Sequence, residues 1–341
     1  MVTIKDVATK AGVTAATVSM ALNNKPSVSE ETRRRIQKIA QEMNYQPSAT
    51  AKALRTNRSH TLGLIVGSLK NEFFMEIIYA VEEYAASKGY IIFVCDAERS
   101  SRKVVSSLRA LASRGVDGIL ISLGFYPDSE IETELRHTME QGIKVLSFTS
   151  AVRFAGMPLV HQNELDLLSS LVDRVVALGH RRIGILSSPE GSWLYNTRLQ
   201  WMMTLLKSRG VYNPDLVWTS PLDLDSGKAS AGAILDSHAD FSVLMCINDM
   251  LAVAAVAAAL ERGIRVPADL SITGIDGINL SRVITPQITT ISLPRFEMGS
   301  LGCRFLIEWI ETGVKNFSEE TQIACSFIEG KTLAEARKEE K

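Results

Sequence analysis

The sequence has no apolar run long enough to cross a membrane. The longest, MLAVAAVAAAL at residues 250–260, falls well short of the roughly 20 apolar residues that a membrane-spanning helix needs. The first residues, MVTIKDVATK, contain no apolar signal core. We therefore expect a buried helix at residues 250–260, no membrane partner and no export.

Cysteine is scarce. The chain has only Cys95, Cys246, Cys303 and Cys325, widely spaced and without a C-x-x-C pair. This set excludes the dense disulfide framework of a small secreted domain. The apolar contexts IIFVCDA and VLMCIND favour buried free thiols in a reducing compartment. We expect a cytoplasmic protein.

Familiar catalytic motifs are missing. The sequence contains no phosphate loop G-x-x-x-x-G-K-[ST], no nucleophile elbow G-x-S-x-G, no zinc motif H-E-x-x-H and no G-x-G-x-x-G between strand and helix. His161 and His180 have no partners at metal-ligand spacing. These absences predict no catalytic residue, no metal site and no cofactor. A sugar-processing enzyme, which would consume its ligand, and an exported sugar-transport protein are the alternatives from other classes.

Charge is unevenly distributed along the chain. Residues 1–60 contain ten Lys and Arg against four Asp and Glu, a balance of +6, whereas the whole chain has a net charge of −1. The remaining residues therefore carry −7. A basic head on an acidic body indicates a small polyanion-binding module joined to another domain, although so short a segment can be basic by chance.

The basic head has the signals of three short helices. Thr3 with Asp6 predicts a capping box at the start of the first helix, and Gly12 ends that helix. Thr14 caps the second helix and Ser29 the third. Apolar residues recur at helical spacing between these points, which predicts a helix-turn-helix. The basic run in the third helix fits either contact with phosphates or a solvated face.

A possible hinge follows the head. Pro47 ends the third helix, and the Ala-rich stretch after Ser48 is only about two turns long, which is marginal for an isolated helix. A segment that folds only with a partner predicts a conditional hinge with Leu54 exposed on it. The alternative is that Leu54 packs on its own domain.

The head and hinge resemble a known family. TIKDVATKAGVTAATVSMALNN and VSEETRRRIQKIAQEMNYQPSATAKALR are similar to the DNA-binding headpiece and hinge helix of the lac repressor family. The resemblance implies that the second helix enters the major groove and that Leu54 wedges into the minor groove. The DNA-binding residues it implies are Thr3, Thr14, Ala15, Ala16, Thr17, Ser19, Met20, Asn23, Ser27, Arg33, Tyr45, Ala51, Leu54 and Arg55.

The head differs from the usual sequence of the family at positions that the resemblance places at the DNA. Met20 stands where the family usually has Arg, and Ser48 where it often has Asn. Ala15 and Ala16 occupy the two positions that commonly set operator preference. Methyl contacts with thymine are the direct readout that these alanines can offer. We therefore expect a larger contribution from DNA shape and from the hinge.

The body alternates short apolar strands with amphipathic helices. Segments such as TLGLIVG, GVDGILIS and RRIGILSS read as strands, with helices such as NEFFMEIIYAVEEYAASKG between them. This alternation predicts two doubly wound parallel-sheet lobes, with a break near Met157 and Pro158. Ligands of such sheets bind outside the carboxyl ends of the strands.

The body also resembles the effector domain of the lac repressor family, whose fold is that of periplasmic sugar-binding proteins. The matching pieces are NEFF, RGVDGILIS, LGHRRIGIL, NTRLQ, INDMLAVAAVAAALERGIRVPADLSITGIDG and TPQITTI. A planar Arg donor facing carboxylate and amide acceptors suits a polyhydroxyl ligand. The effector-binding residues that we expect are Phe73, Phe74, Phe125, Trp193, Arg198, Asn248 and Asp276.

Several of these residues have ordinary alternatives. Asn248 and Asp276 can cap helices, Arg198 can pair with a surface acid, and Trp193 can be packing. The body departs from the family at three places: Gln162–Asn163 where Asp-Asn is common, Gly277 where a second acid often follows, and Trp201 where glycine is usual.

Together these patterns predict a homodimeric transcriptional regulator, a repressor, that binds a near-palindrome of double-stranded operator DNA. A small effector controls it, a sugar or sugar derivative, with a nucleobase or a sugar phosphate as alternatives. The short C-terminal segment lacks an apolar heptad, so no tetramerising coil is expected. The expected parts are a helix-turn-helix domain at 1–46, a hinge at 47–60, a two-lobed effector domain at 61–331 (lobes at 61–157 plus 291–322 and at 158–290 plus 323–331) and a tail at 332–341.

Overall fold

The structure, a computed structural model, describes residues 2–45, 58–189, 192–193 and 195–337. The chain forms two compact units, Met1–Ser59 and His60–Lys341. The expected hinge residues Ser48, Ala51, Leu54 and Arg55 lie outside the described residues. Their roles stay predictions.

The head is the predicted bundle of three helices. They are α1 (Ile4–Ala11), α2 (Ala15–Leu22) and α3 (Glu30–Glu42). Thr3 and Asp6 form the capping box, and Gly12 ends α1 with a left-handed φ of 66°. The side chains of Thr14 and Ser29 cap α2 and α3. Apolar residues of all three helices share one core: Val7, Ala8, Ala11, Val18, Ala21, Val28, Ile36 and Ala40.

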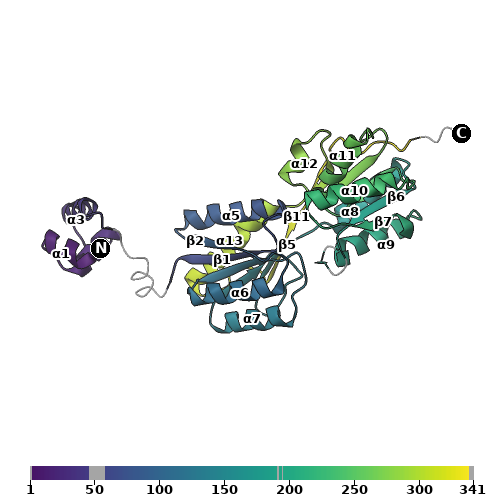
Figure 1. The fold of residues 1–341 in the computed structure, drawn as a ribbon. Helices are drawn as coiled ribbons and strands as arrows, with labels where there is room; N and C mark the ends of the chain where they lie inside the picture. The colour runs from purple at the N-terminus through teal and green to yellow at the C-terminus, as the bar shows by residue number, and fades with distance from the viewer. Residues whose placement is uncertain (1, 46–57, 190–191, 194, 338–341) are drawn as a thin grey trace. The chain divides into compact units, whose positions relative to one another are not determined.

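The first lobe of the body is a parallel sheet between two pairs of helices. In spatial order its strands are β11 (Glu320–Ala324), β5 (Leu159–Asn163), β4 (Lys144–Ser147), β3 (Gly118–Ser122), β1 (Thr61–Val66) and β2 (Ile91–Asp96). Figure 1 shows α5 (Phe73–Ser87) and α13 (Arg295–Thr312) on one face and α6 (Ser101–Ser113) and α7 (Ser129–Glu140) on the other. Successive strand residues point to opposite faces, so Leu64 packs toward the first pair and Ile65 toward the second.

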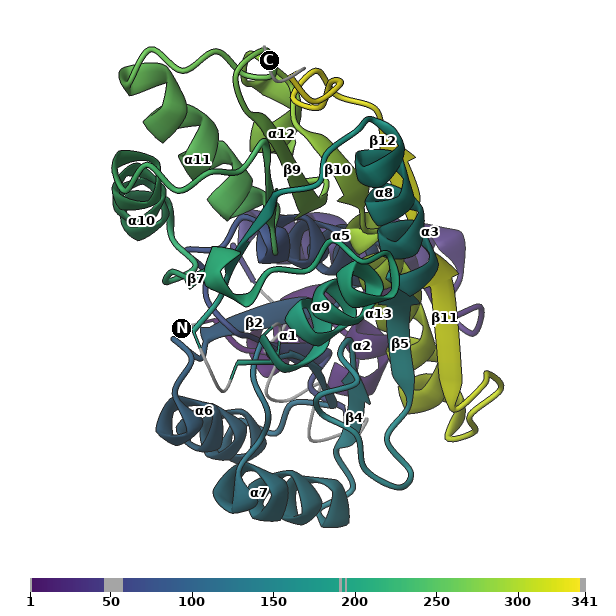
Figure 2. The same ribbon diagram turned by 90° about the vertical axis from the view of Figure 1, so that its right-hand side faces the viewer.

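The second lobe repeats this layering. Its strands lie in the order β12 (Ser326–Ile328), β10 (Thr289–Ser292), β9 (Ser271–Asp276), β8 (Val243–Cys246), β6 (Ile183–Ser187) and β7 (Val217–Thr219). All pairs are parallel except β10 with β12. Figure 2 shows α8 (Leu165–Ala177) and α9 (Gln200–Ser208) on one face and α10 (Leu224–Asp236) and α11 (Asp249–Glu261) on the other. The short elements are a π-helix (Tyr195–Leu199), a 3-10 turn (Pro214–Leu216) and α12 (Asn279–Val283).

The apolar run at residues 250–260 lies in α11, as predicted. Almost every residue of this helix is buried in the second lobe. None of the helices in the described part of the chain is both long and apolar enough to cross a membrane.

The chain crosses between the lobes three times, and the predicted break near Met157 and Pro158 comes too early. Strand β5 pairs with β4 and β11 in the first sheet, so the first crossing follows Asn163. The second crossing lies between β10 and α13, and the third between β11 and β12. The strand pairing, which a one-dimensional pattern does not contain, sets these limits.

The expected tail is part of the second lobe over much of its length. The hydroxyl of Thr332, which is buried, accepts a hydrogen bond of 2.9 Å from the Thr289 amide. The Nε2 atom of His180 lies 2.9 Å from the carbonyl oxygen of Ala334, and its Nδ1 atom lies 2.7 Å from Ser242 Oγ. His180 therefore has the ordinary structural role that its spacing predicted.

Candidate functional site

The head exposes one face of α2. Ala16, Met20 and Asn23 are exposed there, with 36% of Met20 accessible. The amide of Asn23 donates to the carbonyl of Ser19 at 2.7 Å, and the hydroxyl of Ser27 donates to the Met20 sulfur at 3.4 Å. This face is small, apolar at its centre and bordered by hydroxyl and amide groups.

Other residues expected at the DNA also support the head. Thr3 and Thr14 accept helix-capping hydrogen bonds, and Thr14 and Thr17 join their hydroxyls at 2.9 Å. Ala15 and Tyr45 are partly buried against the head core. A DNA contact by any of them must be compatible with these roles.

Arg33 is held within the head. Its guanidinium pairs with Glu30 at 2.8 Å and donates to the carbonyls of Lys25 and Val28 at 2.9 and 3.2 Å. These bonds fix the loop between α2 and α3. Arg33 is therefore a loop-supporting residue here. Arg34 also pairs with Glu30, at 3.1 Å, but its side chain is 77% exposed, which makes it the better candidate for phosphate contact.

Besides the exposed face of α2, the chain has a second candidate site. It is a cavity of about 510 Å³ between the two lobes of the body. Its size is typical of small-molecule sites. Its lining comes from the carboxyl ends of strands, as parallel sheets predict. The lining residues are Gly67, Ser68, Lys70, Asn71, Phe73, Phe74, Glu98, Arg99, Ser122, Leu123, Gly124, Phe148, Thr149, Ser150, His161, Gln162, Pro189, Trp193, Arg198, Pro221, Leu222, Asp223 and Asp276.

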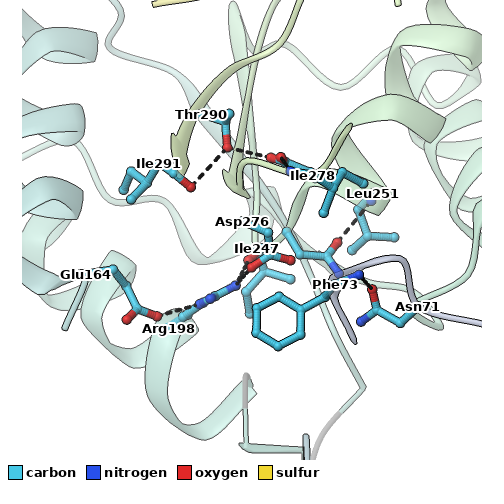
Figure 3. Close-up of polar contacts among 12 residues, drawn as sticks. Asn71, Phe73, Glu164, Arg198, Ile247, Leu251, Asp276, Ile278, Thr290 and Ile291 are labelled. Carbon is cyan, nitrogen blue, oxygen red and sulfur yellow. Dashed lines mark hydrogen bonds and ion pairs between the residues drawn. The ribbon is translucent and has the colours of Figure 1, made fainter. Parts of the chain in front are cut away.

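A buried ion network lies at this cavity (Figure 3): Arg198 and Asp276 belong to the lining, and Glu164 pairs with Arg198 outside the lining. Arg198 is only 1% exposed. Its Nε donates to Glu164 at 2.8 Å, and its Nη1 donates to Asp276 at 2.9 Å and to the carbonyl of Ile247 at 3.0 Å. Both acids are buried, so the alternative interpretation, a pairing of Arg198 with a surface acid, is wrong. The network fixes a planar donor between two acceptors.

The two acids set the charge state of the network. Burial works against the charge on Arg198, but Asp276 and Glu164 outweigh it and raise the pKa of the guanidinium. Burial also raises the pKa of Asp276 to about 6, against the opposing effect of Arg198. The charge of Asp276 is therefore easier to remove than that of an ordinary aspartate.

The backbone at Asp276 is unusual. Asp276 has a φ of 127° and Gly277 a φ of 69°, and positive φ strains a residue that is not glycine. A Cβ atom at Gly277 would lie 2.6 Å from Ser292 Cα. Position 277 of this chain therefore has no room for a side chain in this conformation. The helix-cap interpretation of Asp276 is not supported, because the Ile278 amide donates to Asp249 at 3.0 Å instead.

Aromatic side chains form further parts of the cavity lining. Phe73 and Phe74 meet edge to face with ring centroids 5.1 Å apart. Trp193, from the segment after β6, also lines the cavity and is partly exposed. Trp201 instead packs against the core of the second lobe.

Two expected effector residues lie apart from the lining. Asn248 is fully buried, and its side chain caps α11 by accepting from the Leu251 amide at 3.0 Å, so the capping interpretation is confirmed. Its Nδ2 atom is buried and has no hydrogen-bond partner among the residues described. Phe125 packs against the first-lobe core and pairs with Ser192 through a β-bridge.

The sequence reasoning missed charged residues at the cavity: Lys70 and Arg99 in its lining, and Glu164, which lies outside the lining and pairs with Arg198. Glu164 follows β5 directly, and the rule on carboxyl ends of strands could have found it, since it lies on the first crossing. Lys70 and Arg99 follow β1 and β2 and line the cavity. Lys70 and Arg99 lie in polar loops with other charged residues nearby, so the sequence alone did not single them out.

A three-helix head with a capped turn, ahead of a two-lobed parallel α/β body, defines a class: DNA-binding regulators built on a periplasmic-binding-protein-like body. A family model described as periplasmic binding proteins and sugar binding domain of LacI family matches residues 59–331, and one for bacterial regulatory proteins of the lacI family matches residues 3–48. The chain belongs to the lacI family of bacterial regulatory proteins. It is a DNA-binding transcriptional repressor and not an enzyme.

Individual relatives agree with this assignment. The chain is 32% identical over 313 residues to the transcriptional repressor PurR of Pasteurella multocida, covering 91% of this chain and 92% of that protein. It is 31% identical over 310 residues to the repressor CytR of Escherichia coli, covering 91% and 90%. The solved lac repressor dimer bound to operator and the anti-inducer ONPF has the same fold, with a TM-score of 0.84, 24% identity and coverage of 98% and 99%.

The ion network generates a prediction on stability. Arg198→Met should lower the free energy of unfolding by about 3–5 kcal/mol at neutral pH, because it leaves two buried carboxylates without a partner. The difference in the free energy of unfolding between the variant and the wild type should shrink as pH falls. Asp276 has a folded pKa of about 6, above its ordinary 3.8, although Arg198 opposes this rise. Without Arg198 the carboxyl should bind its proton still more tightly in the folded state, so the variant should gain more stability than the wild type as pH falls.

Urea unfolding of the wild type and the variant between pH 8 and pH 5 measures this difference. Arg209→Met is the matched control, because Arg209 pairs with the exposed Asp173 and its loss should cost at most about 1 kcal/mol. An equal deficit in both variants, or one that does not change with pH, would contradict the account.

Proposed function

We propose that this protein is a homodimeric repressor whose head binds near-palindromic operator DNA and whose interlobe cavity binds a sugar or sugar derivative that changes DNA affinity. The observation that carries the proposal is the cavity between the lobes, which Arg198 and Asp276 help to line, with Glu164 paired to Arg198. The protein would act in the cytoplasm, together with its DNA.

The chemistry of the cavity favours a polyhydroxyl ligand. Sugar hydroxyls both donate and accept, so they can bond the carboxylate of Asp276 and the guanidinium of Arg198 together. Trp193 and Phe73 supply apolar faces for the ring of a sugar. The family model for the body, described in part as a sugar binding domain, supports the same class of ligand.

A sugar phosphate is the second candidate. Lys70 and Arg99 line the cavity from the first lobe. Within the described part of the chain, the structure gives Arg99 no ion pair, so its charge is available to an anionic group. A nucleobase, stacked on Phe73 or Trp193, is the third possibility to test.

Exposed apolar residues support the homodimer. Strand β2 lies at the edge of the first sheet, and Ile91 on it is 67% exposed, with Phe93 and Val94 also exposed. Bare edge strands with apolar side chains favour association. On the second lobe, Leu260 and Val283 are exposed as well. A twofold dimer matches a near-palindromic operator.

The ligand would control DNA binding by changing how the two lobes are arranged. A ligand that prefers one arrangement shifts the population of that arrangement by no more than its difference in affinity. In a dimer, a change between the lobes alters the separation of the two hinges. By resemblance to the family, those hinges fold in the minor groove, with Leu54 inserted. The ligand would thereby change DNA affinity.

Operator selection from a random DNA pool tests the first half of the proposal. The full-length protein should select two inverted half-sites, with affinity falling steeply as salt rises. Met20→Arg should shift the selected bases in each half-site, because Arg can donate twice to guanine, while leaving stability within about 0.5 kcal/mol at this exposed position. Binding of random DNA as tightly as the selected sequence would contradict sequence-specific recognition.

A thermal-shift screen of sugars, sugar phosphates and nucleobases tests the second half. For the compound that stabilises the protein most, Trp193→Leu should weaken binding about three- to tenfold through the lost ring contact. Trp201→Leu is the control, because that ring packs on the second-lobe core. It should lower stability and leave ligand affinity nearly unchanged. The reverse pattern would place the ligand outside this cavity.

A further inference from the structure

Arg295 links the two lobes at a point outside the cavity lining. It is the first residue of α13, follows the second crossing, and is only 2% exposed. Its guanidinium donates to the carbonyl of Asp276 and, at 2.9 Å, to the carbonyl of Gly277 in the second lobe. It also pairs at 2.6 Å with Glu76 of α5 in the first lobe. One buried side chain therefore spans both lobes.

The carbonyls that Arg295 binds belong to the strained turn. Asp276 and Gly277 both have positive φ, a conformation that persists only where surrounding contacts hold it. The side chain of Asp276 leaves this turn toward Arg198, which it meets at 2.9 Å. Arg295 thus holds the backbone from which the cavity carboxylate reaches its partner.

The first turn of α5 contacts the second lobe elsewhere too. The carboxylate of Glu72 accepts a hydrogen bond of 3.3 Å from the Leu280 amide of α12. The ring of Phe73 packs against the cores of both lobes, and the Arg295 guanidinium lies over it at 5.9 Å. Glu72, the N-cap of α5, and Phe73 and Glu76 in its first turn therefore meet the second lobe or Arg295.

We propose that Arg295 and residues 72–76 of α5 form an interlobe latch, which passes a change at the carboxylate of Asp276 to α5. Its relevance to regulation rests on the proposed function, since an effector must act at Asp276 for the latch to report it. Arg295 is a positioning residue. The planar guanidinium of Arg295 bonds three acceptors at once. The ammonium group of a lysine is a point charge and lacks this fixed geometry.

The burial of Arg295 fits positioning better than stabilisation. Its Nε atom is buried and has no hydrogen-bond partner among the residues that the structure describes. A buried charge that is incompletely paired is a weak source of stability. What the side chain provides is a fixed distance between the Asp276 turn and α5.

Hydrogen exchange on the full-length protein, without ligand or DNA, tests the latch. Asp276→Asn removes the charge that faces Arg198 and so perturbs the cavity from within. In an otherwise intact protein it should speed amide exchange in peptides covering residues 71–77 by roughly threefold or more. In the Arg295→Gln variant, exchange in these peptides should already be fast. Adding Asp276→Asn to this variant should speed exchange by less than about twofold more, because the two residues act through one contact.

Four comparisons separate the latch from a general loss of stability. Peptides from α8 serve as an internal reference, and Arg304→Gln, an exposed arginine of the same helix, should leave residues 71–77 unchanged. Glu76→Gln breaks the ion pair from α5, keeps the size of the side chain, and should reproduce Arg295→Gln. Glu82→Gln, exposed on α5, is its control.

The latch is overturned if Asp276→Asn speeds exchange at residues 71–77 equally with and without Arg295, or in neither background. This result does not depend on an effector or an operator. A negative exchange result would refute the latch but not the proposed function, which has its own tests. Failure to find an effector would count against the proposed function but would not change the exchange result.

Discussion

The buried contact between Arg198 and two acids is the constraint on which the body of this protein depends. An arginine in the protein interior is tolerated only where acceptors surround it, and here they come from separate parts of the chain: Glu164 on the first crossing, Asp276 at the end of β9 and the Ile247 carbonyl after β8. The network therefore requires the second sheet and the first crossing to be in place. It also leaves polar atoms facing a cavity between aromatic walls.

The end of β9, which carries Asp276 of this network, departs from regular strand geometry. Asp276 takes a positive φ, and Gly277 admits no side chain beside Ser292. Arg295 binds the carbonyls of both residues and reaches Glu76 across the lobes. Strain of this kind is found at binding and switch sites, where the surroundings hold it in place. A ligand that competes for the Asp276 carboxylate acts on the most constrained turn of the body.

Much of the fold could be predicted from the sequence because local signals fix it. The pairing of Thr3 with Asp6, the left-handed Gly12 and the apolar periodicity determine the head, and strand-helix alternation determines the two lobes. The lobe limits could not be predicted, because the assignment of β5 depends on pairing with β4 and β11. Phe73, Arg198 and Asp276 were found by resemblance, and Trp193 by its place in a loop after a strand. Glu164 and Arg295 were missed, since their partners lie far away in sequence and only the folded chain brings them together.

The account's central claim is that the cavity and the head are thermodynamically coupled. The most direct test is the dissociation constant of the compound found by the thermal-shift screen, measured by calorimetry on the full-length protein with and without a saturating amount of the selected operator. Coupling between sites is reciprocal. The account predicts that operator changes this constant by the same factor by which the compound changes operator affinity, in the range of about 5–150-fold for coupled sites. Equal dissociation constants with and without operator would contradict it.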